Sequence, residues 1–399
     1  MRDARILVAA RALRGFADGA VSVLLAGYLG ALGFTPFQIG AIITGTLLGS
    51  AALTLAVGLL GSHLHLRSVL FFACALMFAT GLGFAGLSSF WPLFVVAVAG
   101  TLNPSAGDVS VFLPTEQAAL ASAAEARERT SLFAWYNVSG TLAGALGALA
   151  SGFPAVLERR GLSGLQAQRL GFVGYAAVAV LVALLYRGLS APLQGPVGPR
   201  VAPLQQSRAI VLRLSLLFSL DSFGGGFVVQ SLLVLWLYRR FQLSVAQAGA
   251  IFFVAGVLAA FSQFASGRLA ARIGLIETMV LTHLPSNVLL ILAGLMPTAP
   301  LAIALLLLRM GLSSMDVPAR QSYVMSVVPK EERSAASSVT NVPRSLASAL
   351  SPLLAGALLS RSDFGWPLVC GGALKAAYDL LLWRQFRSVS PRDEPAAGR

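Results

Sequence analysis

Eight charged side chains lie inside long apolar stretches of this sequence, where an unpaired charge is costly. They are Asp18, Asp108, Asp221, Arg309, Asp316, Arg344, Lys375 and Asp379. A carboxylate in such surroundings can take up and release a proton, and a guanidinium or ammonium group can hold a carboxylate or phosphate. These residues could therefore support proton exchange or anion binding. Which of the two they support depends on the elements that position them.

The apolar stretches indicate a polytopic membrane protein. Of the 399 residues, 56% are hydrophobic and only 11% are charged, a composition rarely found in water-soluble domains. A helix needs about 20 largely apolar residues to cross a bilayer. Runs of that kind lie at approximately 6–32, 38–61, 67–88, 91–114, 130–156, 167–187, 209–237, 245–267, 275–296, 299–320, 335–359 and 366–386. They lack strict alternation, which excludes a barrel. We therefore expect an all-α membrane protein with 12 transmembrane helices in two pseudo-symmetric six-helix halves.

The basic residues predict the topology. The net charge is +13, and 27 of the 29 basic residues are arginines in short tracts between apolar runs, which favours membrane topology over nucleic-acid binding. Most of them lie in segments on the side of the N-terminus. We therefore expect both termini in the cytoplasm of a bacterium, with the chain in its cytoplasmic membrane. The longest polar connector is rich in Pro, Gly and Gln. It predicts an N-terminal bundle at 1–188, a linker at 189–208, a C-terminal bundle at 209–387 and a tail at 388–399.

The two predicted halves repeat each other. The stretch "FQIGAI" at 37–42 matches "AQAGAI" at 246–251, and further on Pro114 and Gln117 align with Pro318 and Gln321. Matches in the same order along both halves indicate a parallel six-plus-six repeat. Such repeats are typical of transporters whose substrate site lies between the halves, near the middle of the bilayer.

Depth along the predicted helices separates the carboxylates. Asp18 and Asp221 each lie about twelve residues from the predicted start of their helix, which is close to the middle of the bilayer at about 1.5 Å per residue. We take them as candidates for proton coupling. The alternative is structural: each carboxylate forms a fixed ion pair with an arginine or caps an interrupted helix.

The three cations Arg309, Arg344 and Lys375 also fall near the middle of their predicted helices. They are candidates for an anionic substrate, although Asp379 follows Lys375 by one helical turn and can neutralise it. Ion pairs at a gate and side chains that reach toward the membrane surface are equally good explanations for any one of them. His283 is isolated in its helix, and we expect a packed, hydrogen-bonded residue rather than a proton relay.

Two loops carry a resemblance to a known family. The stretches "GLLGSHLHLR" (58–67) and "GRLAARIG" (267–274) each follow the second helix of a half and resemble the Gly-x-Leu-x-Asp-Arg-x-Gly-Arg-Arg loop of the major facilitator superfamily. Both copies lack the aspartate of the family pattern. The matched positions, which the resemblance assigns to a cytoplasmic gate, are Gly58, Arg67, Gly267, Arg272 and Gly274. In that family Tyr136, Asn137 and Asn341 would lie where the substrate cavity is often lined.

A second pair of stretches predicts gate residues near the cytoplasmic ends of the fourth and tenth helices. "NPSAGDVSVFLPTEQ" (103–117) aligns with "LSSMDVPARQ" (312–321), and each has an acid before a proline. The acids Asp108 and Asp316 lie far along inward-running helices. Glu116 aligns with Arg320, so we predict an ion pair between these two across the two-fold axis when the cytoplasmic side is closed.

The sequence contains no nucleophile-and-base motif, no dinucleotide fingerprint and no ATP-binding loop. We therefore expect neither an enzyme nor a cofactor or metal, and we expect a monomer. The leading hypothesis is a secondary transporter that moves a small organic solute by alternating access, by proton-coupled efflux. One alternative is a carrier for a carboxylate or phosphate compound that uses the Arg and Lys side chains. Another is a membrane sensor or scaffold with a transporter fold.

Overall fold

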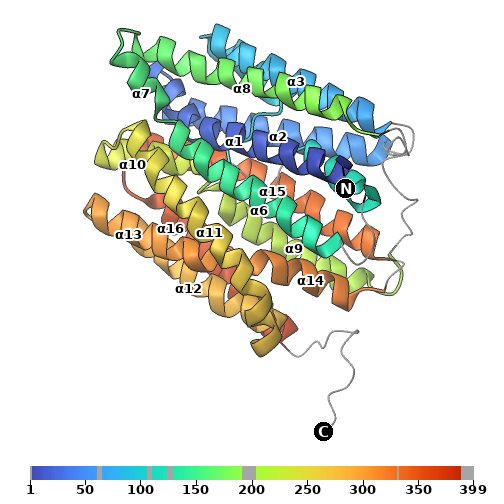
Figure 1. Cartoon of the computed structure of the whole chain (residues 1–399). Coiled ribbons are helices and arrows are strands. Elements are labelled where there is room, and N and C mark those ends of the chain that lie inside the picture. Colours follow the sequence, from blue (N-terminus) through green and yellow to red (C-terminus); the bar gives the residue numbers. More distant parts are fainter. Residues whose placement is uncertain are drawn as a thin grey trace. The chain divides into compact units, whose positions relative to one another are not determined.

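The computed structural model describes residues 2–60, 65–105, 110–123, 129–190, 204–329 and 332–387, and the regular elements in these ranges are helices (Figure 1). In the first part of the chain they are α1 (Arg2–Ala31), α2 (Pro36–Leu60), α3 (Leu66–Gly86), α4 (Phe90–Ala99), α5 (Phe112–Ala123), α6 (Arg129–Ala150), α7 (Phe153–Glu158) and α8 (Gly164–Arg187). In the second part they are α9 (Arg208–Gly226), α10 (Gln230–Phe241), α11 (Val245–Ile273), α12 (Leu275–Leu295), α13 (Ala299–Ser313), α14 (Asp316–Val327), α15 (Arg333–Arg361) and α16 (Trp366–Phe386).

The predicted all-α membrane fold is confirmed. Within the described residues, nine helical stretches are long and apolar enough to cross a membrane by length and composition. The long helices α1 and α16 are not among these nine. Both carry buried charges, with Arg14 and Asp18 on α1 and Lys375 and Asp379 on α16. Charged residues at membrane depth are expected to face protein rather than lipid, which fits their burial.

Three predicted spans are interrupted rather than continuous. The predicted span at 91–114 ends as a helix at Ala99, and helix α5 begins at Phe112. Pro104 lacks an amide proton, and the Asn103 side chain accepts a hydrogen bond from the Ser105 amide at 3.1 Å, so this segment replaces helical bonds with local ones. The run at 299–320 divides between α13 and α14, and the run at 209–237 divides between α9 and α10 after three glycines.

The described chain forms two compact units. Unit 1 contains 1–199, 229–257 and 352–363, and unit 2 contains 200–228, 258–351 and 364–399. The division at 188 and 209 that the sequence predicts stays a prediction. Residues 191–203 of the predicted linker and the whole predicted tail at 388–399 lie outside the described residues.

Glycines bring the helices of unit 1 into backbone contact. Helix α1 packs along α6 and α8, and α3 packs along α8 (Figure 1). A Cβ added at Gly19 would lie 2.0 Å from the backbone oxygen of Gly144, and one at Gly147 would lie 1.9 Å from that of Phe16. Small residues at this spacing allow the close approach that stabilises helix pairs in a bilayer, where lipid removes the hydrophobic drive between helices.

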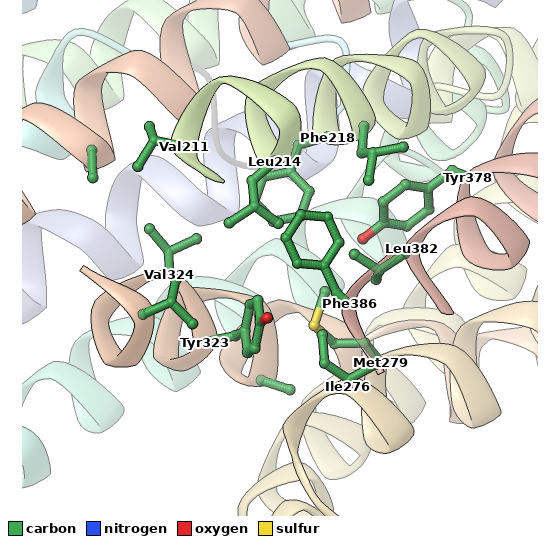
Figure 2. Close-up of a cluster of buried hydrophobic side chains, with 14 of the residues drawn as sticks. Val211, Leu214, Phe218, Ile276, Met279, Tyr323, Val324, Tyr378, Leu382 and Phe386 are labelled. Atoms are coloured by element: carbon green, nitrogen blue, oxygen red, sulfur yellow. The ribbon is translucent and has the colours of Figure 1, made fainter. Parts of the chain in front are cut away.

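The core of unit 2 is a cluster of buried aromatic and aliphatic side chains from α9, α12, α14 and α16. It includes Val211, Leu214, Phe218, Ile276, Met279, Tyr323, Val324, Tyr378, Leu382 and Phe386. Figure 2 shows them pointing toward one another between these helices. The Phe218 and Tyr378 rings meet edge to face with centroids 6.3 Å apart. Because Phe218 and Tyr378 are near neighbours of Asp221 and Asp379 along their helices, this core fixes the backbone that carries the charged groups described next.

Candidate functional site

Asp221 lies at the centre of a buried ionic cluster in unit 2. Its Oδ1 accepts a hydrogen bond from Lys375 Nζ on α16 at 2.6 Å, and its Oδ2 accepts one from Arg320 Nη1 on α14 at 3.3 Å. His283 Nε2 on α12 lies 3.7 Å from Oδ1. Each of these side chains is less than a tenth exposed. The carboxylate is therefore surrounded by groups that can donate protons or carry positive charge.

A second carboxylate continues the cluster through His283. The Nδ1 atom of this histidine lies 2.8 Å from Asp379 Oδ1, and Asn287 Nδ2 donates to Asp379 Oδ2 at 2.8 Å. Asp379 is completely buried. One imidazole thus faces two carboxylates, Asp379 through Nδ1 and Asp221 through Nε2, an arrangement that can pass a proton from one to the other.

Arg320 joins a third carboxylate to the cluster, because its Nη1 also lies 3.4 Å from Asp316 Oδ2 on the same helix. Ligand atoms of Asp221, His283 and Asp316 lie within 4.8 Å of one another, which is metal-binding spacing. Lys375 and Arg320 nevertheless occupy both oxygens of Asp221. These two positive side chains would repel a metal ion and already occupy the oxygens that would bind it. The residues present therefore fit an ion-pair network rather than a metal centre.

The other two predicted cations lie around this cluster. Arg309 on α13 interacts electrostatically with Asp221 and Asp316, yet within the described chain it has no carboxylate at ion-pair distance. Among the described residues its Nε is buried without a hydrogen-bond partner, and its Nη1 donates to the Met310 sulfur at 3.6 Å. Arg344 on α15 donates from Nε to Ser222 at 2.9 Å, the residue after Asp221, and from Nη1 to Asn341 at 3.2 Å.

Unit 1 holds a separate buried network around Glu116 on α5. Its Oε2 is paired with Arg14 on α1 and accepts from the Tyr136 hydroxyl, while its Oε1 accepts from the Tyr186 hydroxyl at 2.5 Å. Glu116, Tyr136 and Tyr186 are fully buried, and Arg14 is 1% exposed. The guanidinium of Arg14 also stacks on the Phe112 ring, 4.2 Å from its centroid.

Asp18 lies near this network on α1. Its neighbours are the positive charges of Arg14 and Arg11 and the hydroxyl of Tyr175, which also donates to the Thr101 carbonyl at 3.1 Å. Asp18 is 6% exposed. It therefore has the charged surroundings that either a titrating carboxylate or a structural one needs, and the geometry fits both sequence-based alternatives.

The two networks repeat one theme with the charges reversed. In unit 1 a cation on α1 pairs with an anion on α5, and in unit 2 an anion on α9 pairs with a cation on α14. Glu116 and Arg320 are the residues that the sequence repeat aligns, and each has its partner within its own unit here. Their predicted pairing with each other in a state closed to the cytoplasm stays a prediction.

The remaining predicted residues lie in more open surroundings. Asn137 and Asn341 are exposed, and Arg67 reaches the backbone oxygen of Arg187 at 3.4 Å. Gly267 and Arg272 are exposed near the end of α11, and Gly274 precedes α12 with φ +95°, a conformation that favours glycine. Gly58 belongs to α2, and Asp108 lies outside the described residues.

Sequence reasoning left several members of these networks out. From the sequence, Arg14 is only one of the N-terminal basic residues that predict the topology. In the structure it is buried and paired with Glu116. Tyr186 ends an apolar run and gives no signal at all. His283 is indeed packed and hydrogen-bonded, as expected, but it lies between two carboxylates. The spacing of His283 and Asn287, one helical turn apart on α12, is the signal that could have indicated a shared polar face.

Comparisons with known proteins agree with this architecture. The chain is 26% identical over 427 aligned positions to an uncharacterized membrane protein of Saccharomyces cerevisiae, covering 98% of this chain and 95% of the yeast protein. Among solved structures, an occupied, inward-facing bacterial homologue of the human lysosomal transporter Spinster matches with a TM-score of 0.73 at 17% identity, covering 96% and 97% of the two chains. A D-xylose-proton symporter matches at 0.72 and 14% identity, covering 95% and 97%.

The human organic anion transporter MFSD10 also matches, with a TM-score of 0.66, 18% identity and coverage of 96% and 99%. At these identities the solved structures show the fold alone. The family model of the Major Facilitator Superfamily matches residues 7–352 and 223–399, which together span nearly the whole chain. The chain therefore belongs to the Major Facilitator Superfamily and is a membrane-embedded secondary transporter of small molecules, not an enzyme.

Proposed function

We propose that this transporter is proton-coupled and exports a small organic solute across the cytoplasmic membrane, with both termini in the cytoplasm. The observation that carries the proposal is Asp221, a buried carboxylate whose charge is balanced by Lys375 and Arg320 and which lies beside His283. A carboxylate in that position changes its partners when it takes up a proton. Such a change is what couples a proton gradient to a conformational equilibrium.

In contrast to the expectation from the sequence, His283 supplies a route for the proton in this proposal. Asp379 lies 2.8 Å from Nδ1, and Asp221 lies 3.7 Å from Nε2, so a proton taken up at one ring nitrogen can be matched by release at the other. Asp18 in unit 1 is the second candidate for coupling, because it also lies among arginines and a tyrosine hydroxyl. Asp221 and Asp18 make different predictions, since of these two only Asp221 lies beside a buried imidazole among the described residues.

The test uses purified protein in liposomes with an imposed pH gradient and a panel of organic cations and anions. Wild-type protein should move protons only when a substrate is present. Asp221→Asn should abolish substrate-dependent proton flux while substrate counterflow persists, and Asp18→Asn should reduce flux less. Asp363→Asn, which removes an exposed pair with Arg239, is the matched control and should leave flux unchanged. Counterflow without proton flux in the wild type would contradict proton coupling. Accumulation of solute in everted vesicles, whose cytoplasmic face points outward, is expected for export, and solute release without accumulation would contradict it.

An organic-anion carrier is the second candidate, and Arg309 favours it. Its buried Nε has no hydrogen-bond partner in the part of the chain that the structure describes, so it offers an open donor to a carboxylate or phosphate group. The fold is shared with a human organic anion transporter, which makes an anion a reasonable substrate class to include in the panel. Arg309→Gln should weaken transport of anions more than that of cations if this candidate is right.

A further inference from the structure

Lys375 depends on one carboxylate for its counter-charge. Its Nζ lies 2.6 Å from Asp221 Oδ1, and within the described chain no second carboxylate lies at ion-pair distance from it. Arg320 differs, because it keeps Asp316 at 3.4 Å whatever the state of Asp221. A proton added to Asp221 therefore removes the compensation of Lys375 in particular. A buried ammonium without a partner is costly, so that state favours the entry of another anion.

Arg309 gives the incoming anion a second donor. Among the described residues its Nε is buried and unpartnered, and the negative charges of Asp221 and Asp316 act on its guanidinium. The charged and titratable groups around Asp221 come from each element packed against it. They are Lys375, Tyr378 and Asp379 on α16, His283 on α12, Arg309 on α13, Asp316 and Arg320 on α14, and Arg344 on α15 through Ser222. Once Asp221 is neutral, four of these groups are cations and two are carboxylates, so this surrounding disfavours a cationic solute.

We propose that the solute is an organic anion that binds Lys375 and Arg309 only when Asp221 carries a proton, so that one proton and one negative charge move together. This inference rests on the proposed proton-coupled transport and names its substrate class. In the absence of solute, Asp221 is the internal anion that neutralises Lys375. Proton binding and solute binding then favour each other. A proton on Asp221 frees Lys375 for the solute, and a bound anion replaces the negative charge that Asp221 provides to Lys375.

The coupling has a consequence for direction. A proton that travels with a single negative charge makes the step electroneutral, so the membrane potential contributes nothing to it. The product of the proton and solute concentrations on each side alone sets the direction, so export requires that this product be higher in the cytoplasm than outside.

The experiment measures anion binding to the purified protein with acetate, benzoate and methanesulfonate as probes and tetramethylammonium as the cationic comparison. For the wild type the apparent Kd of the anions should rise about tenfold per pH unit between pH 5 and pH 8, because one proton binds with each anion. Asp221→Asn keeps the size of the side chain but has no charge, so its anion affinity should not vary with pH. At pH 8 it should exceed that of the wild type by about a thousandfold, since three pH units lie between pH 5 and pH 8.

Two further variants locate the bound anion. Lys375→Gln added to Asp221→Asn should abolish the gain, and Arg309→Gln added to Asp221→Asn should reduce it. Asp363→Asn is the control, because its pair with Arg239 is exposed. The proposal is overturned if Asp221→Asn binds the anions no better than the wild type at pH 8, or if tetramethylammonium binds in their place.

A measurement on the wild type covers the case in which Asp221→Asn does not fold. When benzoate is added, the protein should take up about one proton for each anion that it binds. Calorimetry in two buffers of different ionisation enthalpy measures this proton uptake. Binding without proton uptake overturns the proposal. The same titration in nanodiscs with phosphatidylglycerol separates a solute from a lipid headgroup, since displacement of benzoate by that lipid would identify the headgroup as the ligand.

The two proposals fail in distinguishable ways. Proton flux in liposomes with a cationic solute, and no anion binding to Asp221→Asn, would retain proton coupling and reject the anion site. Anion binding without proton flux would retain the site and reject the coupling.

Discussion

Arg14 and Glu116 show at the scale of single residues how a charge is kept inside the membrane part of the chain. Removing one partner of a buried pair leaves the other uncompensated, which costs about 3–5 kcal/mol. Arg14→Glu and Glu116→Arg should therefore each lower the melting temperature of the purified protein strongly. The double exchange should recover part of that loss, and not all of it, since Tyr136 and Tyr186 donate to a carboxylate at position 116. A double variant as unstable as either single variant would contradict this pairing.

Glu116 also allows its predicted gate pair with Arg320 to be tested separately. Exchanging Glu116 and Arg320 brings an arginine against Arg14 and a glutamate against Asp221 in the present structure. It should therefore lower stability. If the two residues pair with each other when the cytoplasmic side is closed, the exchange should nevertheless preserve transport better than either single reversal, and flux measurements in liposomes decide the question.

Glu332 gives a prediction for pH dependence outside the membrane-spanning helices. The Ser207 hydroxyl and the backbone amides of Gln206, Gln205 and Ser207 donate to its carboxylate and lower its pKa from 4.5 to about 2. These bonds hold the start of α9. A lowered pKa means that the carboxylate stabilises the fold fully above pH 4.5 and loses that effect as the pH falls toward 2.

Glu332→Gln should therefore lower the melting temperature at pH 7, and the gap to the wild type should narrow as the pH falls below 4.5. Glu158→Gln, at an exposed position of α7, is the control and should change little. A gap that stays constant down to pH 3 would show that the charge of Glu332 is not what holds α9.

At the scale of elements, close backbone packing between α1 and α6 carries the next prediction. A methyl group at Gly19 would lie 2.0 Å from the Gly144 carbonyl oxygen, and backbone cannot move aside as a flexible side chain can. Gly19→Ala should therefore destabilise the protein by about 1–3 kcal/mol. Gly30→Ala on the same helix meets nothing within 4 Å and is the matched control. Thermal unfolding of both variants in detergent measures the difference, and equal melting temperatures would contradict the packing argument.

Broken helices are the second feature at this scale, and they show where sequence reasoning was incomplete. Hydropathy identified the apolar runs because membrane helices must satisfy their backbone internally. It did not separate α4 from α5 or α13 from α14, since the mean hydropathy of a run is insensitive to one proline or to a change of helix axis. The acids and bases that matter, Glu116, Asp316 and Arg320, lie on the second piece of these divided runs.

At the scale of the whole molecule the topology is the prediction that remains to be measured. The distribution of arginines predicts that both termini face the cytoplasm. Single cysteines introduced near each terminus, in a variant that lacks Cys74 and Cys370, should react with a membrane-impermeant maleimide only in everted vesicles. A cysteine introduced in the predicted periplasmic turn at 33–35 should react in intact cells. Labelling of either terminus in intact cells would reverse the assignment.

The sequence by itself determined the class of the protein, the run of membrane helices, the repeat of its halves and the residues whose charge is costly. These follow from composition and spacing along one chain, which local physics fixes. Only the tertiary structure decided which charges meet. Asp221 with Lys375 and Glu116 with Arg14 are separated by 154 and 102 residues, and His283 lies between two carboxylates from other helices. Such pairings depend on the rotation of each helix and on its packing against neighbours, and a one-dimensional pattern of charges does not contain that information.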